Sequence, residues 1–208
     1  PLAGDPGSLT PRAPAADRPG GAPVYDLALT VPAPDVVGDG DPAHGADTMR
    51  GGDADDHLFG GVGDDVVLGN LGDDYLEGNG GQDSMYGNLP GVQSGDGDQD
   101  DMIGGSSSWT RSDDPRADVG ETIMQGNGDH DVMLGDNGDI ERIVDGTAWA
   151  VDEVVPDARK RTVTLLDREK DPAGTLDTVS GGDHMQGNGG SDRMYGQGGS
   201  DLVQGNAD

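Results

Sequence analysis

The sequence has 208 residues, of which 39 are glycine and 13 are proline, and only 31% are hydrophobic and 3% aromatic. So little apolar surface cannot offset chain entropy in a conventional globular enzyme core, and no run of about 18 apolar residues predicts a transmembrane segment. The net charge of −29, from 12 basic and 41 acidic residues, excludes nucleic acid as a partner because its phosphates would be repelled.

The N-terminal segment, residues 1–34, is rich in proline and is expected to be extended. Alternating apolar residues from Tyr25 to Val31 predict one strand, over residues 24–31. Two interpretations of this strand stay open: it caps the open end of the structure that follows, or it docks on another molecule. The chain starts with Pro1 and shows no leader sequence, so we expect it to be a processed or excised piece.

A nine-residue repeat follows this segment. From Gly51 the sequence reads GGDADDHLF, GGVGDDVVL, GNLGDDYLE and GNGGQDSMY without a gap. Each unit has glycine first, aspartate sixth and an apolar residue eighth, and further units occur on both sides. The sixth-position aspartates are Asp47, Asp56, Asp65, Asp74, Asp83, Asp100, Asp131, Asp183, Asp192 and Asp201.

Two other residue types keep the same phase. All seven methionines fall at the eighth position of a unit, and asparagines follow the first glycine of several units. Asparagine and glycine both tolerate positive φ, so these positions are expected in tight turns. Some units depart from the pattern. Ala54, Asp98 and Asp129 replace the fourth-position glycine, and Thr122 and Ile140 replace the sixth-position aspartate, so we expect the last two units to bind a cation weakly or not at all.

The pattern resembles the RTX nonapeptide repeat, G-G-x-G-x-D-x-U-x, of secreted calcium-binding proteins. Units in or near register cover most of residues 42–145 and 178–208. The resemblance implies an all-β fold, a right-handed parallel β-roll or β-solenoid. Six residues of each unit then form a turn, three form a strand, and two units complete one coil. The resemblance also implies that the turns bind Ca²⁺.

Two units per coil place each aspartate about 4.8 Å from the aspartate two units further on. Carboxylates at this distance repel each other, and a divalent cation between them reverses the sign of the interaction. Ca²⁺ fits better than Mg²⁺ because it accepts irregular shells of about 6–8 oxygens. We therefore expect at least four calcium ions, between the pairs Asp47/Asp65, Asp56/Asp74, Asp65/Asp83 and Asp183/Asp201.

Glycines in the turns are expected to expose carbonyl oxygens that complete each calcium shell. Ordering nine residues costs on the order of 13 kcal/mol, while burying one eighth-position side chain returns about 2–3 kcal/mol. Calcium binding and folding are therefore expected to be one process. The glycines assigned to the sites are Gly51, Gly60, Gly61, Gly63, Gly69, Gly72, Gly78, Gly81, Gly187, Gly190, Gly196 and Gly199.

The β-roll is expected to span residues 35–208, with insertions at residues 88–94, 105–121 and 147–177. The last insertion is the largest, and we interpret it as a β-hairpin or a lateral loop. It holds a basic cluster: Arg159, Lys160, Arg161, Arg168 and Lys170. This cluster either binds an acidic neighbour or only offsets the charge of a very acidic scaffold.

Two functions are compatible with the sequence. The first is a calcium-dependent structural or interaction module, secreted or at the cell surface. Its terminal edges would meet head to tail in a fibre or surface layer. The second is the calcium-binding portion of a secreted enzyme or toxin whose catalytic domain lies outside this chain. Neither an H-E-x-x-H nor a G-x-S-x-G motif occurs, so we expect no catalytic residues within the chain itself.

Overall fold

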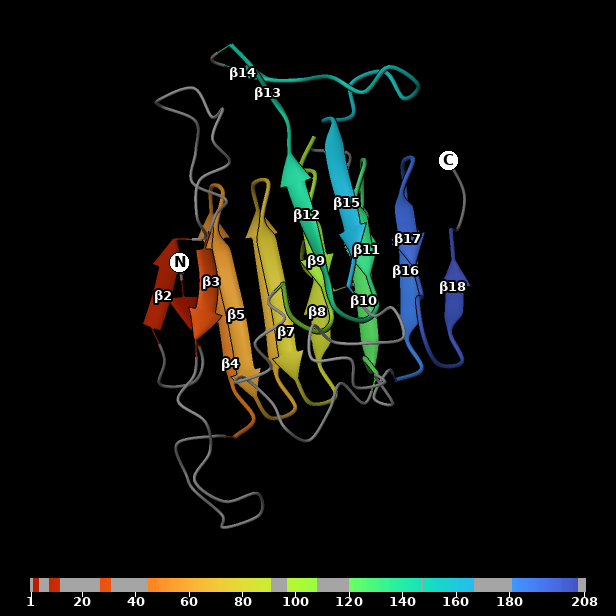
Figure 1. Cartoon of the computed structure of the whole chain (residues 1–208). Coiled ribbons are helices and arrows are strands. Elements are labelled where there is room, and N and C mark those ends of the chain that lie inside the picture. The colour runs from red at the N-terminus through yellow and green to blue at the C-terminus, as the bar shows by residue number, and fades with distance from the viewer. Residues whose placement is uncertain are drawn as a thin grey trace.

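The computed structural model describes residues 2–3, 8–11, 27–30, 45–90, 97–107, 120–146, 148–166 and 181–205. Every regular element in these residues is a β-strand, and most belong to two six-stranded parallel sheets (Figure 1). Sheet I has the order β1-β5-β7-β9-β11-β17, and sheet II has the order β18-β16-β10-β8-β6-β4. Within the described residues, no helix is long and apolar enough to cross a membrane.

From β4 onward the strands of the two sheets alternate along the chain, so the backbone winds as a coil. This arrangement is a parallel β-roll, as the repeat predicts. The strands of sheet I are β1 (Leu2–Ala3), β5 (His57–Val62), β7 (Tyr75–Gly80), β9 (Asp101–Ile103), β11 (Val132–Leu134) and β17 (Arg193–Tyr195). Those of sheet II are β4 (Thr48–Asp53), β6 (Val66–Leu71), β8 (Ser84–Tyr86), β10 (Ile123–Asn127), β16 (His184–Asn188) and β18 (Leu202–Gln204).

Each strand pairs with the strand two units along, which confirms the expected stacking. Leu58 lies beside Leu76 across β5 and β7, and Met49 lies beside Val67 across β4 and β6. The register holds where the repeat is interrupted, because Met85 lies beside Met124. Every pair of neighbouring coils therefore aligns the same positions of the repeat.

The interior between the two sheets is filled by the eighth-position side chains. These residues form one buried cluster to which both sheets contribute. Unbranched methionine suits such a narrow interior because it fills irregular gaps. The cluster consists of Met49, Leu58, Val67, Leu76, Met85, Met102, Met124, Met133 and Met185, with Met194 packed against it.

An antiparallel hairpin covers the outer face of sheet I. β12 (Gly138–Arg142) pairs with β15 (Arg161–Leu165), and both lie in front of β9 and β11 (Figure 1). β13 (Val144–Asp145) and β14 (Ala148–Trp149) form a second, shorter antiparallel pair. A second buried cluster fills the space under the hairpin: Phe59, Tyr75, Ile103, Val132, Leu134 and Ile140.

The hairpin begins earlier than the sequence suggested. The expected start at residue 147 is wrong, because β12 already leaves the roll at Gly138. Residues 135–143 have glycines at the first and fourth positions of a repeat unit. They do not form such a unit, because Ile140 packs into the buried cluster beneath the hairpin. Residues 147 and 167–177 of this insertion lie outside the described residues, as do residues 91–94 and 108–119 of the other two.

The N-terminal segment contributes three short strands. A strand is present at β3 (Leu27–Thr30), but it pairs with β2 (Ser8–Pro11) and not with a described strand of the roll. The edge of sheet I is instead extended by β1, which pairs with β5. A two-residue strand shows no alternation, so the sequence pattern could not reveal it. The rest of residues 1–34 lies outside the described part of the chain.

Candidate metal sites

The sixth-position aspartates form a ladder of hydrogen bonds beside each sheet. In each step, the backbone N–H of one aspartate donates to Oδ1 of the aspartate in the next coil. The donor–acceptor distance is 2.7 Å from Asp47 to Asp65 and 2.8 Å from Asp65 to Asp83. The other steps join Asp56 to Asp74, Asp74 to Asp100, Asp100 to Asp131, Asp131 to Asp192, and Asp183 to Asp201.

The second carboxylate oxygen, Oδ2, points into the turn. A Cβ atom placed on Gly60, the first residue of its unit, would lie 2.6 Å from Oδ2 of Asp65. Glycine is therefore required at the first position, because the carboxylate occupies the space of a side chain. Gly51, Gly69, Gly78, Gly187 and Gly196 lie against Asp56, Asp74, Asp83, Asp192 and Asp201 in the same way.

A backbone carbonyl from the next coil reaches the same point. At Gly69, the added Cβ would meet Oδ2 of Asp74 and, at 2.5 Å, the carbonyl oxygen of Gly87. At Gly51, it would lie 2.9 Å from Oδ2 of Asp56 and 2.7 Å from the carbonyl oxygen of Gly69. These turns thus bring one carboxylate oxygen and one glycine carbonyl oxygen together between two coils.

The fourth position of each turn brings neighbouring coils into close contact. Gly81 has a φ of 136°, and a Cβ there would collide with the carbonyl oxygen of Gly63. The predicted glycines Gly61, Gly63, Gly72, Gly190 and Gly199 also have positive φ. Positive φ also occurs at the second-position residues Asn70, Asn79, Asn127 and Asn188, which confirms that these asparagines lie in tight turns. Asn88 is not among the positive-φ residues, and Asn206 lies outside the described residues.

Several Oδ2 atoms are buried without a hydrogen-bond donor. Among the residues that the structure describes, no donor reaches Oδ2 of Asp74, Asp100, Asp131 or Asp192. Burial, the largest effect, raises the pKa of Asp74 to about 8 and that of Asp192 to about 6. Burial also raises the pKa of Asp100 and Asp131, and neighbouring aspartates add to the rise. Such oxygens need either a proton or a cation.

The donor set fits Ca²⁺. All the converging groups are hard oxygen donors, and Ca²⁺ is the physiological cation that accepts mixed carboxylate and carbonyl shells. Among the described residues, no three acidic, histidine or cysteine side chains are grouped so that they could hold a metal ion by themselves. A cation in these turns would therefore take one carboxylate from each of two coils and draw its other ligands from the backbone. The predicted aspartates and first-position glycines would hold it.

The insertions enter the repeat between the first glycine and its aspartate. Gly87 lies against Asp100, and Gly135 lies against Asp183. In an uninterrupted unit these two residues are separated by five positions, as Gly60 and Asp65 are. The turn therefore keeps its carboxylate when a loop or a hairpin is inserted, and the ladder continues across the gap.

One carboxylate of this kind escaped the sequence analysis. The unit around Thr122 was expected to lack a ligand, but Thr122 is exposed and the preceding residue, Glu121, is buried. The side chain of Glu121 lies against Gly104, the first glycine of that turn. The unit around Ile140 has no such substitute, since Ile140 belongs to the hairpin and Asp183 serves the turn.

Arginine side chains of the hairpin bind the roll itself. Asp101, on the outer face of sheet I, is held between two buried guanidinium groups, with Arg142 at Oδ2 and Arg161 Nε 2.9 Å from Oδ1. Arg142 also donates to the carbonyl oxygens of Asp74 and Gln99, at 3.0 and 2.9 Å. Of the predicted cluster, Arg159 and Arg161 therefore have aspartates of the roll as their acidic neighbours, whereas Lys160 pairs with Glu153 of the insertion itself. Arg168 and Lys170 lie outside the described residues.

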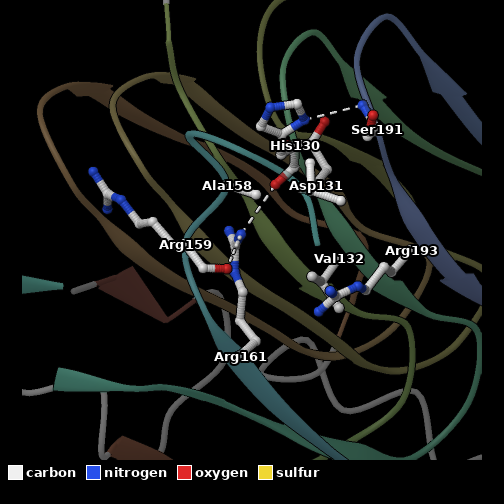
Figure 2. A pocket seen from close by; sticks show the side chains of 9 residues that line it. His130, Asp131, Val132, Ala158, Arg159, Arg161, Ser191 and Arg193 are labelled. Atoms are coloured by element: carbon white, nitrogen blue, oxygen red, sulfur yellow. Dashed lines mark hydrogen bonds between the residues drawn. The ribbon is translucent and has the colours of Figure 1, made fainter. Parts of the chain in front are cut away.

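Figure 2 shows a small cavity between the hairpin and the roll. The Arg161 side chain donates to the carbonyl oxygen of His130 over 3.1 Å, and the Ser191 N–H donates to His130 Nδ1 over 3.0 Å. The cavity has a volume of about 10 Å³, roughly enough for one water molecule. Its arginines pair with aspartates: Arg159 with Asp73, Arg161 with Asp101, and Arg193 with Asp152. This space holds no substrate-sized ligand.

These features define a class of protein: a β-roll whose stacked turns present buried carboxylate and glycine carbonyl oxygens to a hard cation. A family model of the RTX calcium-binding nonapeptide repeat, in four copies, matches residues 45–76, 60–89 and 177–208. The chain thus carries RTX calcium-binding repeats and is a calcium-binding β-roll module. Searches of curated proteins and of solved structures found no significant match. Coils between residues 97 and 134 lie outside the family match, yet their aspartates continue the same ladder.

Proposed function

We propose that this chain is an extracellular structural or interaction module whose roll folds when Ca²⁺ fills its turns. The buried, donor-free Oδ2 atoms of Asp74, Asp100, Asp131 and Asp192 carry the proposal. Stacked buried carboxylates destabilise the ion-free roll, and each cation removes that cost. Extracellular calcium modules have dissociation constants of about 0.1–1 mM. We expect the same range here, because each ion would take part of its ligands from backbone carbonyls.

A calcium titration followed by far-UV circular dichroism tests this proposal. The chain in EDTA should lack the β signal of the roll and gain it cooperatively as Ca²⁺ rises to millimolar concentration. Mg²⁺ at the same concentrations is the control, and it should induce little structure because it demands a stricter octahedral shell. An equal β signal in EDTA and in calcium at neutral pH would contradict the proposal.

We also propose that two copies meet head to tail at sheet II. In each observed step of the ladder, an N–H donates to Oδ1 of the next coil, so the first and last described coils present complementary groups. Asp47 offers its carboxylate at one end, and Asp201 offers its N–H at the other. Among the described strands, β4 pairs only with β6 and β18 pairs only with β16, and β18 exposes Leu202 and Val203. Such a contact does not close on itself and therefore extends into a filament.

Sedimentation in millimolar calcium tests the assembly separately from the folding. The wild type should form species larger than a monomer, and Leu202→Lys should remain monomeric while folding normally, because Leu202 is exposed on β18. A wild type that folds in calcium and stays monomeric at high concentration would refute the filament and leave the module intact.

No catalytic role is proposed for the chain. Its buried carboxylates occupy equivalent places in successive turns, as ligands of repeated ions would. A general acid and base would instead need two different environments at one place.

A further inference from the structure

We infer that Glu121 is a calcium ligand that replaces the sixth-position aspartate of its turn. This inference rests on the proposed function, because it assigns one more site of the same kind. It concerns the turn between β9 and β10, where the sequence offers Thr122 in place of aspartate. Three independent observations place Glu121 where an aspartate lies in the other turns.

The first observation is the backbone hydrogen bonding of this coil. In a regular coil, the residue after the aspartate donates its N–H to the aspartate carbonyl of the preceding coil, as Ser84 does to Asp65 over 2.8 Å. In this coil both Thr122 and Ile123 direct their N–H groups at the Asp83 carbonyl, over 2.9 and 3.4 Å, while the strand pairing places Ile123 beside Ser84. Thr122 is therefore an extra residue at the start of the strand, as in a β-bulge, and Glu121 is the residue that precedes it at the end of the turn.

The second observation is the ladder bond. The N–H of Glu121 donates to Oδ1 of Asp183 over 3.0 Å, as the N–H of Asp183 does to Oδ1 of Asp201 over 3.2 Å. Toward Asp183, Glu121 therefore occupies the same place in the sheet II ladder as the aspartates of the regular turns.

The third observation is the position of the side chain. Glu121 is 2% exposed, and its carboxylate lies against Gly104 beside the carbonyl oxygen of Gly135. Asp83 lies against Gly78 beside the carbonyl oxygen of Gly104 in the same manner. Gly120, the residue before Glu121, has a φ of 90° and shapes the end of this turn.

The neighbouring coil supplies the second carboxylate. Asp183 is 2% exposed, and its Oδ2 accepts no N–H from the residues that the structure describes. The group that faces it is the carboxyl of Glu121. Two buried carboxyl groups in contact, with a glycine carbonyl beside them, form the oxygen set that binds calcium in the regular turns.

The alternative is that Glu121 is a protonated structural acid, and an isosteric variant separates the two roles. Calcium ions bound per chain are counted by native mass spectrometry and equilibrium dialysis for the wild type, Glu121→Gln and the control Thr122→Val. We expect Glu121→Gln to bind at least one ion fewer and to need several-fold more calcium for folding. Thr122→Val should match the wild type, because that side chain is exposed.

An unchanged ion count with an equal or lower calcium midpoint in Glu121→Gln would overturn the assignment, because a neutral acid is mimicked by glutamine. If Glu121→Gln fails to fold at any calcium concentration, Glu121→Asp decides. Folding of Glu121→Asp at raised calcium supports the ligand role, and its failure indicates a purely steric one. A wild type that binds no calcium would instead refute the proposed function as a whole.

Discussion

Asp131 and Asp192 are neighbours in adjacent coils, although 61 residues separate them in the sequence, and the N–H of Asp131 donates to Oδ1 of Asp192 over 3.1 Å. Asp47 makes the same bond to Asp65 over a separation of 18 residues. The coil therefore closes in the same way with or without an insertion between two neighbouring turns. Stacking of the turns, and not sequence spacing, defines each site.

The position of an aspartate in its ladder should determine the effect of its removal. Asp65 has a described coil on each side, accepting a bond from Asp47 and donating one to Asp83, whereas Asp201 lies in the last described coil. We expect Asp65→Ala to raise the calcium midpoint of folding more than Asp201→Ala does. The loss at Asp65 should be at least about 1.5 kcal/mol in calcium, the cost of one charged hydrogen bond. Equal midpoints in a circular dichroism titration would contradict the stacking.

First-position glycines should not tolerate a methyl group. In Gly69→Ala the new Cβ would collide with Oδ2 of Asp74 and the carbonyl oxygen of Gly87, neither of which can move without displacing a coil. We expect a loss of about 1–3 kcal/mol, as for other overpacked sites, and weaker calcium binding. Gly45→Ala is the matched control, because nothing lies within 4 Å of its added Cβ. Denaturant unfolding in saturating calcium measures both variants, and similar losses would refute the argument.

Much of this fold could be predicted because the repeat is strict where it is uninterrupted. A single unit specifies the turn glycine Gly60, the carboxylate of Asp65 and the interior side chain of Val67. Stacking with a period of two units then follows, and the pairing of Asp65 with Asp83 confirms it. Local sequence suffices here because every contact repeats.

The missed features all depend on contacts that the sequence spacing does not encode. Nothing near Gly135 indicates that its partner is Asp183, since the whole hairpin intervenes. Glu121 was overlooked because the pattern demanded an aspartate one residue later. A signal was available, since the chain has only five glutamates and this one immediately precedes the sixth position of a degenerate unit.

Ala54 should be a weak point of the first complete turn. It occupies a fourth position with a φ of 82°, which costs an L-residue about 1–2 kcal/mol. We therefore expect Ala54→Gly to stabilise the calcium-loaded roll by about 1 kcal/mol, after allowance for the greater chain entropy of glycine. Ala46→Gly is the control, since Ala46 is not among the positive-φ residues and gains only the entropy penalty. Chemical unfolding in calcium measures the difference between the two variants. If Ala54→Gly is less stable than the wild type, Ala54 is not strained.

The hairpin should stabilise the roll through Arg142. Its guanidinium group pairs with buried Asp101 and reaches carbonyl oxygens on two coils. Arg142→Met leaves Asp101 with one cation fewer in a buried place, and breaking such a pair costs about 3–5 kcal/mol. Lys160→Gln is the control: its partner Glu153 is exposed, and the unfolding midpoint should not change. Fluorescence of Trp149, which packs against Arg142, measures the unfolding of the hairpin. Equal unfolding midpoints for the two variants would show that Arg142 does not stabilise the roll.

The stability of the roll should fall as pH rises in the absence of calcium, and should rise with pH in its presence. Burial raises the pKa of Asp74 to about 8 from 3.8, and that of Asp192 to about 6. Between about pH 4 and pH 8 the ion-free roll therefore binds more protons than the unfolded chain, so its stability falls as pH rises. In EDTA we expect more roll structure at pH 5 than at pH 8.

Calcium reverses this trend because it binds only the deprotonated carboxylates. The calcium concentration at half folding should therefore increase as pH falls from 8 to 5, as protons compete for the same oxygens. Circular dichroism at both pH values, with EDTA and with graded calcium, measures the two responses in one series. A calcium midpoint that is independent of pH would show that the buried Oδ2 atoms are not the ligands. An ion-free chain that gains no structure at pH 5 would show that calcium also supplies backbone cross-links that protons cannot replace.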